Sequence, residues 1–235
     1  MENQNSKGDC DPGQALSLEE LFKVPKPERE KAWLDPFLAA IPTAGLASTD
    51  PQVLMGPDGF PYFALYSPPA DAEYEAFCIK NLIPDILLKN GVGVAINPSS
   101  EGVDWVFSYG DILNWHLRNE FYSKAAGPQG PIDEEDPGTL IIEKIPDDVL
   151  PMKAREVLRS FLKSKNIKRP KAFYLSQTTE KNILKSLVFN IFEEDIKDPA
   201  TFNTLMEQIQ WYLPKHYYIS RVPNDPEWNS YFSDL

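Results

Sequence analysis

The residues best suited to chemistry are few and lie far apart in the chain. The two histidines are His116 and His216, and His116 stands four residues before Glu120. That spacing can place two metal ligands on one face of a helix. However, His116 also lies beside the apolar stripe of the same predicted helix, and no second histidine is near in sequence. We therefore interpret His116 as a boundary residue paired loosely with a carboxylate, and we predict no metal site.

Sequence motifs of well-known catalytic and cofactor sites are absent. The chain has no Gly-x-Ser-x-Gly nucleophile elbow, no Walker-type phosphate loop and no dinucleotide fingerprint. Acidic runs at 133–136 and 193–195 are of the kind that binds divalent cations weakly, but such runs are more often solvated charge. We predict no catalytic residues and no cofactor.

One polar loop is the strongest candidate for a binding site. It joins two predicted buried strands, at 92–96 and 103–107, and such loops are where small folds often present a site. The alternative, which we favour, is that Asn97 and Ser99 only satisfy backbone groups of the turn. The candidate residues are Asn97, Pro98, Ser99, Ser100, Glu101 and Trp105.

Aromatic side chains near residue 230 are candidates for a protein interface. They are Trp228, Tyr231 and Phe232, and large aromatic residues contribute much of the binding energy of interfaces. The alternative is that they dock back on their own domain.

The charge balance and the distribution of apolar residues each argue against one class of partner. The chain carries 35 acidic and 23 basic residues, a formal net charge of −12. Nucleic-acid binding needs a dense cationic surface, so we expect no nucleic-acid partner. No apolar run is long enough to span a bilayer and no signal peptide is recognisable, so we expect no membrane association.

The two cysteines give no basis for a disulfide framework. Cys10 falls in a polar stretch, and Cys78 is interpreted as a small buried apolar residue. The default expectation is a reducing, cytoplasmic setting.

Composition divides the chain into four parts. Residues 1–15 lack apolar periodicity and are predicted to be a disordered leader. Residues 16–122 form an N-terminal α+β domain and residues 139–235 a second domain. The stretch at 123–138 combines acidic residues with proline and glycine, a composition typical of linkers.

The first domain is predicted to have the element order α-α-β-β-α-β-β-α, a mixed sheet with flanking helices. Capping boxes at Ser17–Glu20 and Ser108–Asp111 each open a helix. A third helix is expected from about 71 to 89, ended by Gly91.

The second domain has the predicted order β-α-β-β-α-β, with Asp198 and Pro199 starting its second helix. This is the order of the split-βαβ, ferredoxin-like unit. We expect both helices on one face of a four-stranded antiparallel sheet, so that the chain is an α+β protein of two small domains.

Several short segments share features with one protein family. They lie at 62–68 (YFALYSP), 91–98 (GVGVAINP) and the helix at 108–117, and in the second domain at 171–175, 186–191 and 217–221. These segments resemble the SseB (serine-sensitivity) family. Where that family has glycine after Asn-Pro this chain has Ser99, so the turn either changes type or shifts its glycine to Gly102. The resemblance implies a bacterial cytosolic protein without an assigned reaction.

The leading functional hypothesis is a non-catalytic cytosolic binding or regulatory protein with a protein partner. One alternative is a small-molecule enzyme that uses carboxylates such as Glu101 or Asp104 in a cleft between the domains. The other is an acidic immunity-type protein that neutralises a basic partner through electrostatic steering. The sequence leaves the ligand and the oligomeric state open.

Overall fold

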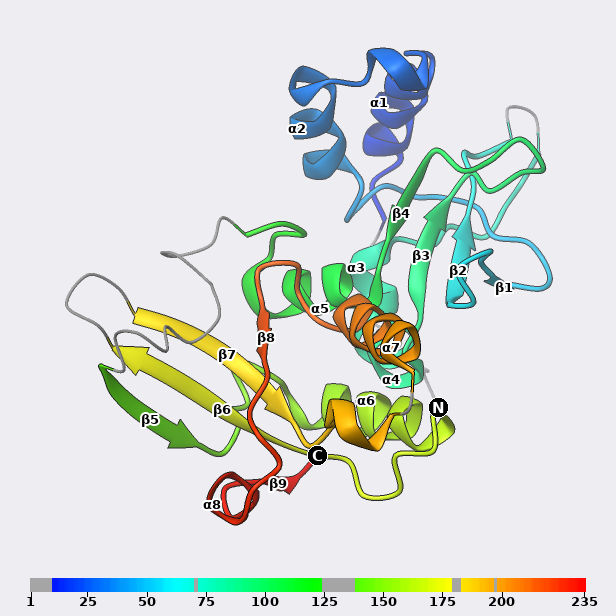
Figure 1. Cartoon of the computed structure of the whole chain (residues 1–235). Coiled ribbons are helices and arrows are strands. Elements are labelled where there is room, and N and C mark those ends of the chain that lie inside the picture. Colours follow the sequence, from blue (N-terminus) through cyan, green and yellow to red (C-terminus); the bar gives the residue numbers. More distant parts are fainter. Residues whose placement is uncertain (1–9, 70–71, 124–137, 179–182, 197) are drawn as a thin grey trace, which may run out of the picture. The chain divides into compact units, whose positions relative to one another are not determined.

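The computed structural model describes residues 10–69, 72–123, 138–178, 183–196 and 198–235. The chain divides into two units, Met1–Ile112 and Leu113–Leu235. Each unit carries its own sheet (Figure 1), and the predicted α+β class is confirmed. The division falls within a helix, whereas the predicted linker at 123–138 lies almost wholly outside the described residues.

The first unit begins with two helices and a 3-10 turn. They are α1 (Pro12–Phe22), η1 (Lys26–Glu28) and α2 (Lys31–Ala40). The predicted disordered leader is therefore wrong for residues 10–15, while residues 1–9 lie outside the description. Asp11 caps α1 by accepting hydrogen bonds from the amides of Gly13 and Gln14 at 2.8 and 3.3 Å. Aspartate followed by Pro12 is a strong helix start, and it precedes the capping box expected at Ser17.

The predicted helix from 71 to 89 is wrong in its first half. The backbones of Leu46 and Phe77 exchange two hydrogen bonds of 2.9 and 2.8 Å, so this stretch is extended. The helix begins only at Ile79 and passes through a π-helical turn around Pro84, where the proline has no amide to donate. Gly91 ends it with φ +69°, as predicted. The pieces are α3 (Ile79–Leu82), η2 (Ile83–Leu87) and α4 (Leu88–Asn90).

The sheet of the first unit has the order β1-β2-β3-β4. Strands β2 and β3 are parallel and the other two pairs are antiparallel, so the predicted mixed sheet is confirmed. The capping box that opens α5 is also confirmed, because Ser108 and Asp111 each bond the other's backbone amide, at 3.1 and 2.9 Å. The elements are β1 (Val53–Met55), β2 (Pro61–Leu65), β3 (Gly93–Ile96), β4 (Trp105–Phe107) and α5 (Tyr109–Arg118).

The second unit follows the predicted order βαββαβ and adds a short C-terminal helix and strand. Asp198 caps α7 as predicted, accepting from the amides of Ala200 and Thr201. The elements are β5 (Thr139–Glu143), α6 (Met152–Ser164), β6 (Lys171–Thr178), β7 (Ile183–Phe189), η3 (Glu193–Asp195), α7 (Pro199–Trp211), β8 (Tyr218–Ser220), α8 (Pro226–Asn229) and β9 (Ser233–Asp234).

The pairing of these strands differs from the predicted antiparallel sheet. The order is β5-β6-β7-β8, with β7 and β8 parallel and β9 pairing β6. Because α7 carries the chain from one end of the sheet back to the other, β8 runs in the same direction as β7. Strands joined by a helix are direct neighbours here, whereas in a split-βαβ unit another strand lies between them. The ferredoxin-like topology is therefore not the one observed.

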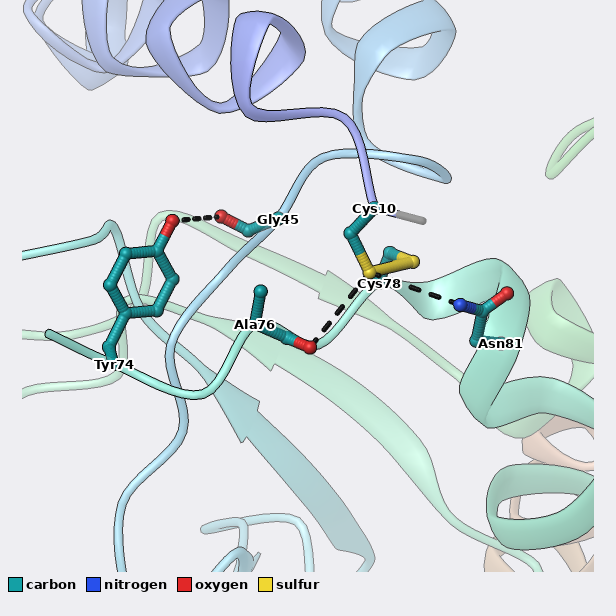
Figure 2. Close-up of a disulfide and its surroundings, with 6 residues drawn as sticks. All are labelled: Cys10, Gly45, Tyr74, Ala76, Cys78 and Asn81. Carbon is teal, nitrogen blue, oxygen red and sulfur yellow. Dashed lines mark hydrogen bonds between the residues drawn. A yellow bond between two sulfur atoms is a disulfide. The ribbon is translucent and has the colours of Figure 1, made fainter. Parts of the chain in front are cut away.

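A disulfide joins Cys10 to Cys78 (Figure 2), which corrects the expectation of no disulfide. The Cα atoms are 5.6 Å apart and the two residues are separated by 68 positions. Cys78 is only 2% exposed, so its predicted burial is confirmed. A hydrogen bond of 2.7 Å from the Asp11 amide to the Thr43 carbonyl also ties the segment before α1 to the chain that follows α2. Disulfides persist mainly in oxidising compartments, so cysteine usage no longer supports a reducing setting.

None of the described helices is long and apolar enough to cross a membrane.

Removing the disulfide is expected to destabilise the first unit. The substitution Cys10→Ser should lower its free energy of unfolding by about 4 kcal/mol, because a long loop is no longer closed in the unfolded chain. Denaturant unfolding without reductant measures this. Wild-type protein unfolded with reductant is the control and should match the variant. Equal unfolding midpoints for wild-type protein with and without reductant would contradict the prediction.

Candidate functional site

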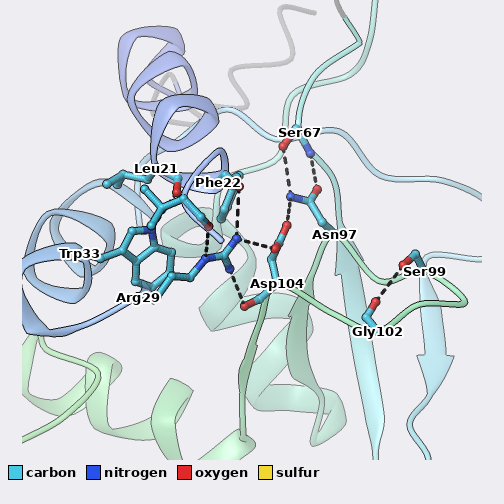
Figure 3. A network of polar contacts seen from close by, with 10 residues as sticks. Leu21, Phe22, Arg29, Trp33, Ser67, Asn97, Ser99, Gly102 and Asp104 are labelled. Carbon is cyan, nitrogen blue, oxygen red and sulfur yellow. Dashed lines mark hydrogen bonds and ion pairs between the residues drawn. The ribbon is translucent and has the colours of Figure 1, made fainter. Parts of the chain in front are cut away.

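The predicted binding turn is held by its own side chains. Asn97 adopts φ +50°, and its carboxamide oxygen accepts a hydrogen bond from the Ser67 amide at 2.8 Å. Its nitrogen donates to the Ser67 hydroxyl at 3.2 Å and to a carboxylate oxygen of Asp104 at 2.9 Å (Figure 3). The Asn97 side chain thus ties the end of β3 to the chain after β2.

Asp104 continues this network to the helices at the start of the unit. Its other carboxylate oxygen pairs with Arg29 at 2.9 Å, and the two side chains are only 17% and 7% exposed. The same guanidinium donates to the carbonyl oxygens of Phe22, Val24 and Asp104. It also lies 4.8 Å from the ring of Trp33. We call these contacts the Arg29–Asp104–Asn97 network.

The tip of the predicted turn makes only local contacts. The amide of Ser99 donates to the Gly102 carbonyl at 2.7 Å, and its hydroxyl accepts from the Glu101 amide at 3.2 Å. Gly102 takes φ +128°, so the glycine of this turn sits there rather than at 99. Ser99, Ser100 and Glu101 are exposed and Pro98 is half-buried. Such contacts are the ones expected if Asn97 and Ser99 only satisfy backbone groups of the turn.

Trp105, the last candidate of that group, belongs to an aromatic cluster. Its ring lies 5.6 Å from Trp33 and 5.2 Å from Phe37. The half-buried indole therefore packs strand β4 against helix α2. Glu101 and Asp104, named for carboxylate chemistry, do not act as a pair, since Asp104 is bound by Arg29 and Glu101 is on the exposed tip.

The aromatic residues near 230 dock on their own unit. The rings of Trp228, Tyr231 and Phe232 lie 6.0, 6.4 and 4.8 Å from the buried ring of Phe173. Strand β9 continues this docking by pairing with the start of β6. Tyr231 keeps 43% of its surface exposed.

His116 is exposed on α5. Partial burial, and then the nearby charge of Lys153, lower the pKa of its imidazole. Within the described ranges, no three side chains of His, Cys, Asp or Glu are grouped so as to hold a metal ion.

A hollow in the second unit gathers side chains that the sequence did not single out together. Its volume is about 360 Å³, and it is lined by the end of α5, the loop before α6, strands β6 and β7, and the start of β8. We call it the His216 hollow. Its ionisable side chains are Arg118, Asp148, Tyr174, Lys185, His216, Tyr217 and Tyr218.

The register of strands β6 and β7 places two of these side chains on the same face of the sheet. Tyr174 on β6 pairs with Leu187 on β7, and Lys185 lies two residues before Leu187, so both side chains face the same side of the sheet. Tyr217 directly precedes β8 and its hydroxyl donates to the Val149 carbonyl at 2.9 Å. That bond anchors the loop before α6 at the edge of the hollow.

Burial shifts the pKa values of three aromatic side chains that line the hollow. It raises the pKa of Tyr174, and the carboxylates Asp148 and Glu143 raise it further. It also raises the pKa of Tyr217, partly offset by Arg118. Burial, and then the charge of Arg118, lower the pKa of His216. Near neutral pH the phenols therefore keep their protons and the imidazole is uncharged.

Sequence reasoning missed this hollow because its residues span a hundred positions. His216 has no second candidate ligand near it in the sequence. The available signal was the run His216-Tyr217-Tyr218 at the start of a predicted strand. Its significance depends on which strand it lies beside, and no local motif contains that information.

No protein-family model, curated protein or solved structure matches the chain. The geometry of the two units is therefore the basis on which a function is argued.

Breaking the Arg29–Asp104–Asn97 network is expected to destabilise the first unit. Arg29→Met should cost about 3 kcal/mol of unfolding free energy, because it leaves Asp104 largely buried without its counter-ion. Lys31→Met is the matched control. Lys31 and Asp35 form an exposed pair, with 83% and 63% of their side-chain surfaces accessible, and such pairs contribute little. Calorimetric unfolding of both variants tests this, and equal losses would contradict it.

Proposed function

We propose that the chain is a non-catalytic binding protein that takes a small polar ligand in the His216 hollow. The observation that carries the proposal is the convergence of seven ionisable side chains from separate segments on one hollow. A volume of about 360 Å³ falls within the range usual for ligand sites. Shifted pKa values, as for Tyr174 and His216, are also enriched at functional sites.

Two hydroxyl groups of the hollow are held by hydrogen bonds within the second unit. The Ser123 hydroxyl donates to a carboxylate oxygen of Glu120 at 2.6 Å and accepts from Asn114 at 3.0 Å, which ties it to the end of α5. The Tyr217 hydroxyl donates to a backbone carbonyl. These groups shape the hollow.

The cellular setting and the family relationship are proposals that do not rest on the His216 hollow. Membership of the SseB family rests on the short motifs described above, and a cytoplasmic location rests on that resemblance. The Cys10–Cys78 disulfide weighs against a reducing compartment. The idea of an acidic protein that neutralises a basic partner rests on the net charge alone.

The binding proposal predicts where ligands are seen. Full-length ¹⁵N-labelled protein, screened with a library of anionic, neutral and cationic fragments, should show chemical-shift changes at the amides of Tyr174, Lys185 and Tyr217. Bound fragments should be recovered unchanged.

A hollow-filling substitution provides the control. Tyr174→Trp should abolish these shift changes because the larger ring occupies the hollow. Tyr231→Trp, at an exposed tyrosine of the same unit, should leave them intact. Fragments that bind only elsewhere, or that are chemically converted, would refute the proposal.

A further inference from the structure

We infer that the ligand of the His216 hollow is a small hydroxylated anion, in which a carboxylate or phosphate group is accompanied by a hydroxyl group. The inference rests on the proposed function and adds the chemical class of the ligand. It is carried by two cations, a half-buried phenol and one carboxylate that line the same hollow.

The two cations favour a negative group. Arg118 and Lys185 both line the hollow of a chain whose net charge is −12. Among the described residues, neither has a carboxylate within ion-pair distance. Arginine offers a planar set of donors that matches carboxylate and phosphate oxygens, and lysine adds a compact charge. An anion would supply the counter-charge that the described part of the protein does not.

The Tyr174 phenol complements the same group. The Tyr174 hydroxyl has no hydrogen-bond partner within the described ranges. It carries its proton at neutral pH, as tyrosines ordinarily do, and burial raises its pKa further. It can therefore donate to an anionic oxygen. The Tyr217 hydroxyl donates to the Val149 carbonyl, so towards other groups its oxygen acts as an acceptor. His216 is uncharged near neutral pH and offers one donor and one acceptor.

Asp148 indicates which group of the ligand accompanies the anionic one. Its carboxylate is exposed at the hollow and its charge acts on both Tyr174 and Tyr217. A second anionic group of the ligand would be repelled there, whereas a hydroxyl would donate a hydrogen bond to it. The hollow therefore favours one negative group accompanied by a hydroxyl.

Four probes separate these features. Glycerate is a hydroxylated carboxylate, glycerol 3-phosphate a hydroxylated phosphate, propionate an anion without hydroxyls, and glycerol a hydroxylated neutral molecule. Titrations of full-length protein, followed by amide shifts of Tyr174 and Tyr217, should show binding of glycerate or glycerol 3-phosphate. Propionate should bind about tenfold more weakly, as expected for one lost charge-assisted hydrogen bond, and glycerol should not bind detectably. Comparing the first two probes identifies the preferred anionic group.

Substitutions test the assigned residues. Lys185→Met and Arg118→Met should each weaken binding of the preferred anion about tenfold or more, while Lys163→Met, at an exposed lysine on α6, should not. Asp148→Ala should remove the preference for glycerate over propionate. All four positions are exposed, and unchanged thermal unfolding confirms that each variant is folded.

The outcomes distinguish the inference from the proposed function. If glycerol binds as well as the anions, if none of the four probes binds, or if neither cation substitution matters, the inference is overturned. Fragment binding that Tyr174→Trp abolishes would still support the hollow as a binding site. If no fragment binds in the hollow, the proposed function itself is refuted, and the inference with it.

Discussion

The ion pair between Arg29 and Asp104 determines how the first unit is assembled. The Arg29 guanidinium bonds to backbone carbonyls at and just after the end of α1 and to the loop before β4, so one side chain contacts both the N-terminal helices and the edge of the sheet. A largely buried charge of this kind is tolerated only when its donors and acceptors are satisfied. Asn97 satisfies the second oxygen of Asp104. The polar turn that looks like a binding site in the sequence is therefore the point at which this unit is tied together.

The charged side chains that the structure describes in the His216 hollow are not paired with one another in this way. In the Arg29–Asp104–Asn97 network each charge has a partner within the fold, whereas the cations of the His216 hollow have no carboxylate partner among the described residues. Polar groups that satisfy one another stabilise a structure. Polar groups that converge on an open hollow are available to a ligand. This difference, more than residue type, decides which of the two places is the better candidate for a site.

Local signals predicted the elements well and their long-range contacts poorly. The Ser108–Asp111 box and the Asp198-Pro199 start were correct because each depends on residues within a single turn of helix. The extended stretch before Ile79 was missed, since Phe77 pairs with Leu46, and helical spacing alone does not reveal such a partner. The disulfide was missed for the same reason, because its cysteines are 68 positions apart in the sequence. Tertiary contacts outweigh local preference at these positions.

The place of β8 in the strand order shows why the site itself could not be predicted. In the observed parallel pairing Ser186 lies beside Tyr218, so His216 and Tyr217 emerge next to Lys185, at the start of β7. In the split-βαβ sheet expected from the element order, β8 would run in the same direction as β7, but another strand would lie between them. His216 and Tyr217 would then not lie next to Lys185. Residues on two strands are neighbours only if the strand order places those strands side by side. The same local sequences would then have formed the same strands without gathering a histidine, three tyrosines and a lysine in one hollow. Strand order, which no single segment encodes, is therefore the feature that assembles the candidate site.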